Sequence, residues 1–142
     1  MVQRVTRASV TVGGEVVGEI GTGALVLLGM VRGDDAAAAR ALAERVGRLR
    51  YFADDQGRMN LSLDQVDGKL LVVSQFTLAA DGRRGRRPSF DQALDPALAE
   101  PLYELFIETL EALGLSCSRG VFGAQMAVEL LNDGPVTFVL ES

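Results

Sequence analysis

The chain has 142 residues, of which 48% are hydrophobic, and its formal net charge is −5. This length is typical of one domain, so we expect a single domain over residues 1–142 with a hydrophobic core of its own. The composition excludes disordered chains, because too many residues are apolar, and membrane-spanning chains, because no apolar run approaches about 18 residues. Proteins that coat nucleic acid are usually basic, so any contact with nucleic acid must be local.

Histidine, cysteine and lysine are absent or nearly absent. The lack of histidine excludes Ser-His-Asp and Cys-His catalysis and zinc sites that use histidine. Cys117 is the only cysteine, so an intramolecular disulfide is excluded, and Lys69 is the only lysine that a lysine-based reaction could use. The first residues carry charge but lack the apolar stretch of a signal peptide. We therefore expect a cytoplasmic protein that uses no metal and no cofactor.

The first part of the chain predicts strands. Residues 5–12 have a strand pattern, Gly13-Gly14 is a two-residue hairpin signal, and residues 15–20 form the returning antiparallel strand. Residues 24–31 are a continuous apolar run, which is typical of a buried central strand.

A helix is predicted next. Asp34 or Asp35 can cap it, because an Asp side chain can accept a hydrogen bond from an N–H of the first turn. Apolar residues then recur at helical spacing as far as Leu49. Residues 51–52 and 59–63 then predict two short strands on either side of a polar turn.

The second half predicts one long strand, one helix and a group of final strands. Residues 69–78 have a strong strand pattern, and residues 79–91 are a polar loop. Asp95-Pro96 is a helix-start signal, because Asp is a good cap and Pro is favoured in the first turn. Pro101 either kinks this helix or marks its true start. The final strands are predicted over residues 115–119, 125–131 and 136–140.

This pattern amounts to about eight strands and two helices. Two amphipathic helices cannot cover both faces of so large a sheet. The sequence therefore predicts an α/β fold with two β-layers of mostly antiparallel or mixed sheet and both helices on one side.

Three short segments bear chemistry, and the first is SQFT, Ser74 to Thr77, at the end of an apolar strand. One interpretation is that its hydroxyls satisfy backbone groups where the strand ends. As nucleophiles they are poorly equipped, because such a hydroxyl needs an adjacent base and the chain has no histidine. Lys69 is roughly 26 Å from Thr77 along an extended strand, which is too far to help within one subunit.

The second segment places Arg83, Arg84, Arg86 and Arg87 on the polar loop. One interpretation is a solvated loop. The other is contact with phosphates, because concentrated positive charge on an acidic protein steers a polyanion to one place. Such contacts position an RNA without reading its sequence.

The third segment is NDGP, Asn132 to Pro135, which interrupts a strand-forming run. It fits an ordinary hairpin turn in which Pro135 opens the last strand. It also fits a cis Gly134-Pro135 bond, which would turn neighbouring carbonyls to the same side, where they can hold an ammonium group.

These segments together resemble the D-aminoacyl-tRNA deacylases. The stretches QRVTRASV, VSQFTL, GRRPSF, FGAQM and NDGPVT follow the order seen in that family, over essentially the whole chain. SQFT alone is weak evidence, whereas SQFT followed by GRRPSF and NDGPVT is strong evidence. Family members usually begin with two or three more residues before QRV, so we expect a clipped first strand.

The resemblance implies a cytoplasmic homodimer of three layers, not bound to membranes, that hydrolyses the ester between a D-amino acid and tRNA and also removes glycine mischarged onto tRNA. In the family, SQFT and a Gly-cisPro motif build the site, and the Gly-Pro of one subunit reaches into the pocket of the other. Arg4 matches the Arg of QRV, which supports the Gly-Pro loop. The matching site residues are Ser74, Gln75, Phe76 and Thr77, then Gly134 and Pro135 with their neighbour Asn132 for substrate binding and chiral selection.

The missing base favours a mechanism in which the 2′-hydroxyl of the terminal ribose assists cleavage while the Phe76 N–H polarises the ester carbonyl. A D side chain then points outward, an L side chain collides with the Gly134-Pro135 backbone, and glycine passes. Two alternatives remain open. One is an RNA-binding dimer without catalysis. The other is an esterase that uses Thr77 as nucleophile on small D-amino acid esters.

Overall fold

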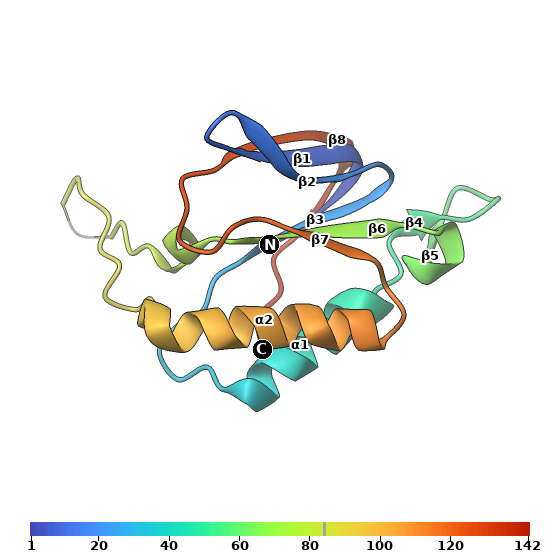
Figure 1. Ribbon diagram of the computed structural model, residues 1–142. Coiled ribbons are helices and arrows are strands. Elements are labelled where there is room, and N and C mark those ends of the chain that lie inside the picture. The colour runs from blue at the N-terminus through green and yellow to red at the C-terminus, as the bar shows by residue number, and fades with distance from the viewer. Residues whose placement is uncertain (84) are drawn as a thin grey trace.

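A computed structural model describes residues 1–83 and 85–142 of the chain, and its elements stack in three layers (Figure 1). The upper β-layer contains β1 (Val2–Val12), β2 (Glu15–Ile20) and β8 (Ala127–Phe138), and the lower β-layer contains β3 (Gly23–Leu28), β6 (Lys69–Ser74) and β7 (Cys117–Arg119). The helices α1 (Ala36–Arg48) and α2 (Pro96–Ala112) cover the free face of the lower layer. The expected α/β class, with mixed sheet and both helices on one side, is confirmed.

Strand β1 organises the upper layer, because it pairs along both of its edges. On one edge β2 returns antiparallel after the Gly13-Gly14 turn, whose residues both have positive φ angles of 58° and 86°. On the other edge β8 pairs antiparallel from Thr11↔Ala127 to Val2↔Phe138. The first residues of β1 also pair with β3, so the two β-layers belong to one six-stranded sheet.

The lower layer is parallel, and this explains where the helices lie. Strands β3 and β6 pair in parallel, as do β6 and β7. Parallel neighbours need a crossover connection, and α1 and α2 supply these two crossovers. Figure 1 shows both crossovers on the same face of the sheet.

Each helix begins at a predicted cap. The Asp35 carboxylate accepts from the Ala38 N–H at 2.9 Å, and the Asp95 carboxylate accepts from the Ala97 N–H at 2.9 Å. Because α2 begins at Pro96, Pro101 lies inside the helix and does not mark its start. The carbonyl that loses its partner at Pro101 is that of Ala97, an exposed residue, which makes the proline tolerable.

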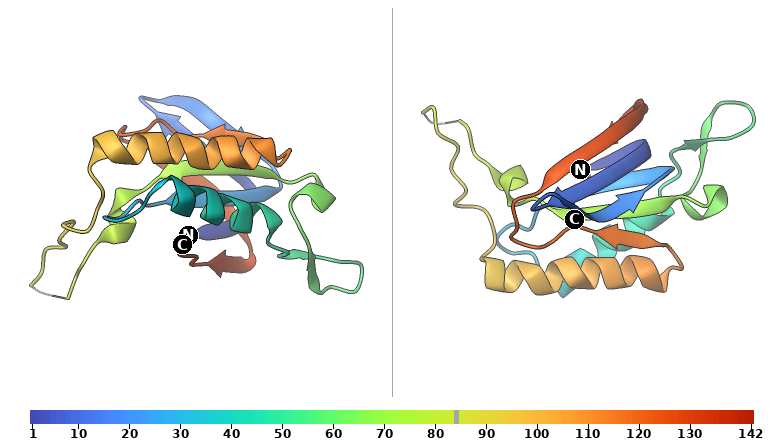
Figure 2. Two further views of the ribbon diagram at one scale, coloured as in Figure 1. Left: turned by 90° about the horizontal axis from the view of Figure 1, so that it is seen from below. Right: turned by 45° about the horizontal axis from the view of Figure 1, so that its top comes forward.

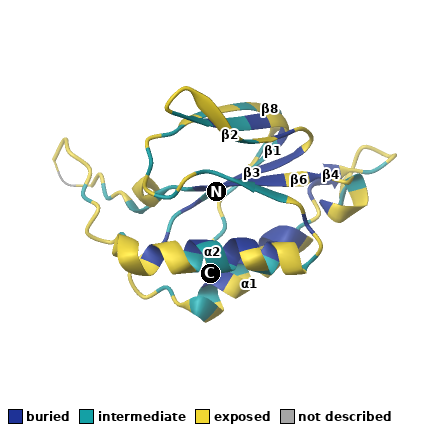
Figure 3. Ribbon diagram, in the orientation of Figure 1, coloured by how far each residue is buried: buried dark blue, intermediate teal, exposed yellow. Residues whose placement is uncertain are grey.

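Two hydrophobic cores fill the two spaces between layers. Alternate residues of one strand point to different cores: Leu70 and Val72 of β6 pack toward the helices, whereas Leu71 and Val73 pack toward β1 and β2. Figure 3 shows these central strands buried and the outer faces of the helices exposed. The buried residues Tyr103 and Phe106 are among those that join α2 to the lower layer.

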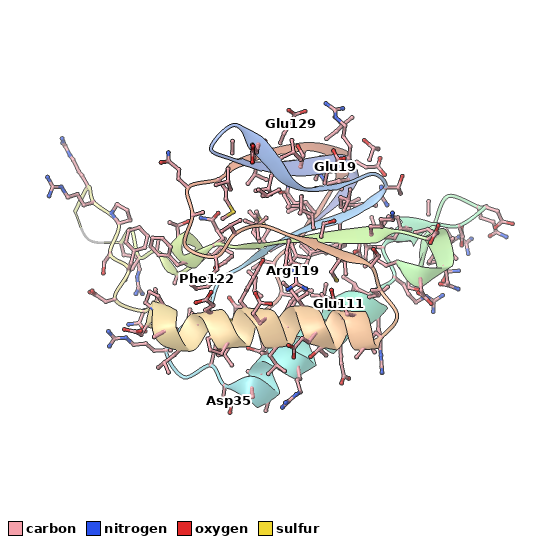
Figure 4. The ribbon with its side chains drawn as sticks, in the orientation of Figure 1. Glu19, Asp35, Glu111, Arg119, Phe122 and Glu129 are labelled. Atoms are coloured by element: carbon pink, nitrogen blue, oxygen red, sulfur yellow. The ribbon has the colours of Figure 1, made fainter. Side chains whose placement is uncertain are left out.

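The sheet curls until its two outer edges, β2 and β7, meet. The Ser118 hydroxyl donates to the Glu19 carbonyl at 3.1 Å. A Cβ atom added at Gly18 would lie 2.7 Å from the Arg119 carbonyl, so only glycine permits this approach. Arg119 also pairs with Glu104 at 2.7 Å and Glu111 at 3.1 Å, and Figure 4 shows its side chain directed toward α2.

Two segments project from opposite ends of the molecule (Figure 2). One contains the short strands β4 (Phe52–Ala53) and β5 (Met59–Leu61), followed by the 3₁₀ turn η1 (Asp64–Val66). The other is the polar loop that precedes α2. No helix within residues 1–83 and 85–142 is long and apolar enough to cross a membrane.

Several predicted strand boundaries are wrong. Strand β1 begins at Val2 rather than at residue 5, and β7 begins at Cys117 rather than at residue 115. Strand β3 ends at Leu28 rather than at residue 31. The strand predicted over residues 69–78 ends at Ser74, and a 3₁₀ turn, η2 (Phe76–Ala79), takes its place. The final two predicted strands are one continuous strand, β8, whose pairing with β1 is irregular in its middle.

Candidate functional site

A pocket of about 870 Å³ opens at the carboxyl end of β6, between η2, the start of α2 and the segment that follows β7. Its wall is mostly apolar and includes the rings of Phe76, Phe90 and Phe122. Figure 4 shows Phe122 between the β-layers and the N-terminal half of α2. Small-molecule sites typically measure about 300–1,000 Å³ and have such apolar walls with a few polar groups.

The wall at β6 is built by the turn that ends the strand. The Gln75 N–H donates to the Leu28 carbonyl at 2.8 Å, which is the last hydrogen bond along β3. The chain then turns into η2. A Cβ atom at Gly29 would lie 3.0 Å from the Gln75 carbonyl and 3.1 Å from the Leu78 Cβ, so the glycine lets η2 lie close to the end of β3.

The first N–H groups of η2 have no acceptor within the described parts of the chain. The turn uses the N–H of Leu78, which donates to the Gln75 carbonyl, and that of Ala80, which donates to the Thr77 carbonyl. The N–H groups of Phe76 and Thr77 remain unused, as expected for the first residues of a helical turn. The turn therefore offers backbone donors at the edge of the pocket that Phe76 lines.

The polar side chains of SQFT bond to each other rather than to a base. The Gln75 side-chain amide donates to the Thr77 hydroxyl, and Thr77 is exposed. Ser74 is half-buried and lines the pocket. Within the described residues no base bonds to the Thr77 hydroxyl, and a threonine nucleophile needs one.

An aromatic pair joins the pocket to the base of the polar loop. The rings of Phe76 and Phe90 meet edge to face, with centroids 5.2 Å apart. Beside them, Asp81 and Ser89 exchange backbone hydrogen bonds of 2.8 Å and 2.9 Å, which close the loop at its base. The loop is thereby attached to the pocket wall.

The four arginines predicted on this loop are not equivalent. The Arg83 guanidinium binds both carboxylate oxygens of Asp81, at 2.9 Å and 2.7 Å, and this hydrogen bonding lowers the pKa of Asp81. Arg86 and Arg87 are exposed. Arg84 lies outside the described residues. The cation at Arg83 is therefore already paired, which the sequence did not indicate.

The NDGP segment and Val136 form a corner opposite Arg4. We call residues 132–136 the corner. The register of β1 and β8 passes from Gln3↔Thr137 to Val5↔Asn132, so the corner leaves the regular ladder. The peptide bond between Gly134 and Pro135 is cis, as one of the two interpretations expected.

Side-chain hydrogen bonds hold this corner. The Arg4 side chain is only 12% exposed and pairs with the Asp133 carboxylate at 3.0 Å, while its Nη1 donates to the Tyr51 carbonyl at 2.7 Å. The Asn132 amide spans the corner, because it donates to the Arg4 carbonyl at 2.8 Å and to the Val136 carbonyl at 3.1 Å. Burial raises the pKa of Tyr51, and the nearby Arg4 opposes this rise.

Gly134 is required by local geometry. Its φ of +112° lies in the region that favours glycine. A Cβ atom there would lie 2.7 Å from Arg4 Nη2 and 2.8 Å from a Val136 methyl group. Any larger residue would therefore disturb the contact between the corner and Arg4.

The structure collects most of the predicted site residues into two groups, and Thr77 is absent from the described lining of the pocket. Ser74, Gln75 and Phe76 line the pocket, whereas Arg4, Asn132, Gly134 and Pro135 are absent from its described lining. Sequence reasoning gave no role to Arg32, Phe90 and Phe122, which also line the pocket. Two of these lie in the stretches GRRPSF and FGAQM, and this was the only signal for them.

The electrostatics of the pocket are simple. Arg32 and Asp95 are its only ionisable residues within the described parts of the chain. Residues 1–83 and 85–142 contain no group of three or more His, Cys, Asp and Glu side chains able to hold a metal ion. The other polar side chains in the described lining are those of Ser74 and Gln75.

Comparison with known proteins gives consistent results. The family profile described as D-Tyr-tRNA(Tyr) deacylase matches residues 1–141. A D-aminoacyl-tRNA deacylase of Symbiobacterium thermophilum is 59% identical over all of this chain and 94% of its own length, and one of Roseiflexus sp. is 58% identical over all of this chain and 92% of its own.

Solved structures agree. One described as a c-Myc DNA unwinding element binding protein superposes with a TM-score of 0.92 at 42% identity, and covers 99% of this chain and 96% of its own. A probable eukaryotic D-amino acid tRNA deacylase has a TM-score of 0.80 at 17% identity over 94% of this chain and 93% of its own, which supports the fold. The chain therefore belongs to the D-Tyr-tRNA(Tyr) deacylase family and is a hydrolase of that kind.

Proposed function

We propose that this protein hydrolyses the ester bond of D-aminoacyl-tRNA, releases free tRNA and the D-amino acid, and also removes glycine mischarged onto tRNA. The observation that carries the proposal is the pair of unused N–H groups at the start of η2, beside a mostly apolar pocket whose only carboxylate within the described residues, that of Asp95, already caps α2. An ester needs a polarised carbonyl and an oriented nucleophile, and backbone donors supply the first. The acidic protein meets its RNA in the cytoplasm.

The chemical step uses a hydroxyl of the substrate in place of a protein base. The Phe76 N–H stabilises the negative charge that forms on the carbonyl oxygen of the ester when water adds to the carbonyl carbon. The ribose 2′-hydroxyl orients this water and relays its proton to the 3′-oxygen, which leaves as the carbon–oxygen bond breaks. The protein contributes orientation, which converts a slow bimolecular reaction into a faster one within the complex.

Chiral selection is assigned to the corner of a second copy of the chain. Gly134 and Pro135 are absent from the described lining of the pocket in their own chain, so a homodimer with reciprocal corners would complete both sites. The carbonyls of the partner's corner clamp the α-amine. A D side chain then points outward, an L side chain collides with the backbone, and glycine passes.

The first experiment incubates catalytic amounts of protein with D-Tyr-tRNA, L-Tyr-tRNA and Gly-tRNA. Multiple turnovers are expected on the D-ester and the glycyl ester, and almost none on the L-ester. Equal hydrolysis of D and L esters would contradict chiral selection. Stoichiometric binding without turnover would instead support an RNA-binding dimer.

The role of the 2′-hydroxyl has its own test. A D-Tyr-tRNA that ends in 2′-deoxyadenosine should bind with little change but react at least about a hundredfold more slowly, because the assisting group is missing. An unchanged rate would remove the RNA-assisted route and favour Thr77 as the nucleophile.

The polar loop is assigned to tRNA phosphates. Replacing Arg86 and Arg87 with Ala should weaken tRNA binding and lower the dependence of log K on log salt by about one for each phosphate that is no longer neutralised. The matched control replaces the exposed Arg40 and Arg48 of α1 with Ala, and its salt slope should stay close to that of the wild type. If both double variants had the same dependence of log K on log salt, the loop would be solvated and would not contact phosphates.

A further inference from the structure

The rim of the pocket carries one arginine that the proposed mechanism does not use. Arg32 and Asp95 line the pocket and are both exposed, so they lie where the pocket meets solvent. The Asp95 carboxylate already accepts from the Ala97 N–H as the cap of α2. Within the described residues, no carboxylate lies within salt-bridge distance of Arg32.

The backbone of Arg32 is held firmly in place. Its N–H donates to the Gln92 carbonyl at 2.9 Å, and the Leu94 N–H donates to the Met30 carbonyl at 3.0 Å. Residues 30–32 therefore pair antiparallel with residues 92–94, through the bridge Val31↔Ala93. An arginine on such a fixed segment presents its guanidinium to a limited region of the rim.

The paired segment also connects Arg32 to the polar loop. Residues 92–94 follow Phe90, whose ring packs on Phe76 in the pocket wall. The loop that carries Arg86 and Arg87 ends just before Phe90. Arg32 is thus paired with the stretch of backbone that continues from the loop through Phe90 along the pocket wall.

We propose that Arg32 is a positioning residue that binds the phosphate on the 5′ side of the terminal nucleotide of the tRNA. This inference rests on the proposed function. If the amino acid and the terminal nucleoside occupy the apolar pocket, the RNA must leave across the rim. Its first charged group there is the 5′-phosphate, and guanidinium binds phosphate oxygens in a bidentate manner. Arg32 thereby sets the depth at which the ester enters the pocket, while the loop contacts later phosphates.

The test uses two minimal substrates that differ only in this phosphate: the D-tyrosyl ester of adenosine and the D-tyrosyl ester of adenosine 5′-monophosphate. At low salt the wild type should show a KM about three- to tenfold lower for the phosphorylated ester, with a similar kcat. Arg32→Gln should give equal KM values for both esters, and Arg32→Lys should retain part of the preference because it keeps the charge.

Two further variants sharpen the test. Asp95→Asn keeps a good helix cap but removes a negative charge from the rim, so the preference for the phosphorylated ester should increase. Arg58→Gln removes an exposed arginine of the projecting β4–β5 turn and should leave the preference unchanged. If Arg32→Gln affected only the stability of the protein, the kinetic constants for both esters would change equally.

The outcomes separate this inference from the proposed function. If the wild type hydrolyses both esters with the same KM, or if Arg32→Gln keeps the full preference, the assignment of Arg32 is wrong and the deacylase function stands. If neither ester nor D-Tyr-tRNA is hydrolysed, the proposed function itself fails.

Discussion

The pocket beside β6 and the corner opposite Arg4 hold their polar groups in different ways. In the pocket, the unused donors are backbone N–H groups of η2, and the polar side chains around them, Ser74, Gln75 and Thr77, are half-buried or exposed. In the corner, one arginine that is 12% exposed and one asparagine fix the backbone through side-chain hydrogen bonds. Backbone donors tolerate most substitutions, whereas a corner held by few side chains does not.

This difference matches the two tasks that we propose for these regions. A site that accepts many amino acids benefits from donors that depend only on the course of the chain. A site that rejects one enantiomer needs a rigid obstacle, and in the proposed dimer the backbone at Gly134, which lies close to Arg4, would supply one. Substitutions can separate the two regions, and the largest effect is expected in the pocket.

The first change removes a backbone donor of the pocket. Phe76→Pro deletes the N–H of the first residue of η2, a position where proline is tolerated, and Gln75 (φ −143°, ψ 81°) lies outside the α region that a following proline disfavours. We expect kcat to fall by about 10²–10³, the usual cost of removing a donor to an oxyanion. Phe76→Ala is the control, because it keeps the N–H, and steady-state kinetics on D-Tyr-tRNA should show a much smaller loss. Equal losses of activity in Phe76→Pro and Phe76→Ala would show that the phenyl ring, not the N–H, causes the effect.

The second change disturbs the corner. Gly134→Ala should cost about 1–2 kcal/mol through its positive φ and also displace Arg4, so deacylation should fall by more than about tenfold while the fold is kept. Gly33→Ala is the control, because its φ is +98° and nothing lies within 4 Å of the added atom. Chemical denaturation and kinetics should show similar stability losses but a loss of activity only at Gly134. Full activity of Gly134→Ala would contradict a role of the corner.

The third change tests the core that supports the pocket. The Tyr103 hydroxyl donates to the Val72 carbonyl at 2.9 Å, and this carbonyl also accepts from the Gly120 N–H at 3.0 Å. Because the carbonyl keeps one donor, Tyr103→Phe should lower the free energy of unfolding by only about 1 kcal/mol.

The same variant has a signature in alkaline solution. Burial raises the pKa of Tyr103 to about 12, whereas the unfolded chain titrates near the ordinary value of 10. The folded state holds the proton more tightly, so this contribution to stability is complete below pH 10 and is lost between pH 10 and about 12. In that window the unfolding free energy of the wild type should fall more steeply than that of Tyr103→Phe, measured by urea denaturation. If the unfolding free energies of the wild type and of Tyr103→Phe fell in parallel with pH, Tyr103 would not be the group responsible.

The smallest effect is expected at Thr77. Its hydroxyl accepts from the Gln75 amide and bonds to no base within the described residues, so Thr77→Ala should keep the deacylation rate within about threefold. A loss of several orders of magnitude, together with a covalent acyl-enzyme, would establish Thr77 as the nucleophile instead.

The layers, the hairpin at Gly13-Gly14 and both helix caps were predictable, because they follow from local patterns of apolar residues and turn signals. The end of β6 was not, since strand-forming residues continue as far as residue 78 although the chain turns away at Gln75. The union of two predicted strands into β8 depends on pairing with β1, which a local pattern does not contain.

The site was predictable in part. Three residues of SQFT line the pocket, and Arg4 lies beside the corner as the sequence indicated, whereas a catalytic role of SQFT and a role of NDGP in the site stay predictions. The pocket residues Arg32 and Phe122 come from distant segments and meet only in the folded chain, so composition and spacing did not indicate them. The pairing of Arg83 with Asp81 likewise depends on the shape of the loop.

The central claim is that the pocket of one chain and the corner of another form one site, and mixed dimers test it most directly. Phe76→Pro and Gly134→Ala chains are co-expressed with different tags, and the heterodimer is isolated by two affinity steps. It would contain one site with both mutations and one site with none. We predict about half of the wild-type activity from two nearly inactive parents. Activity no higher than that of the parents, or failure to form any dimer, would contradict the claim.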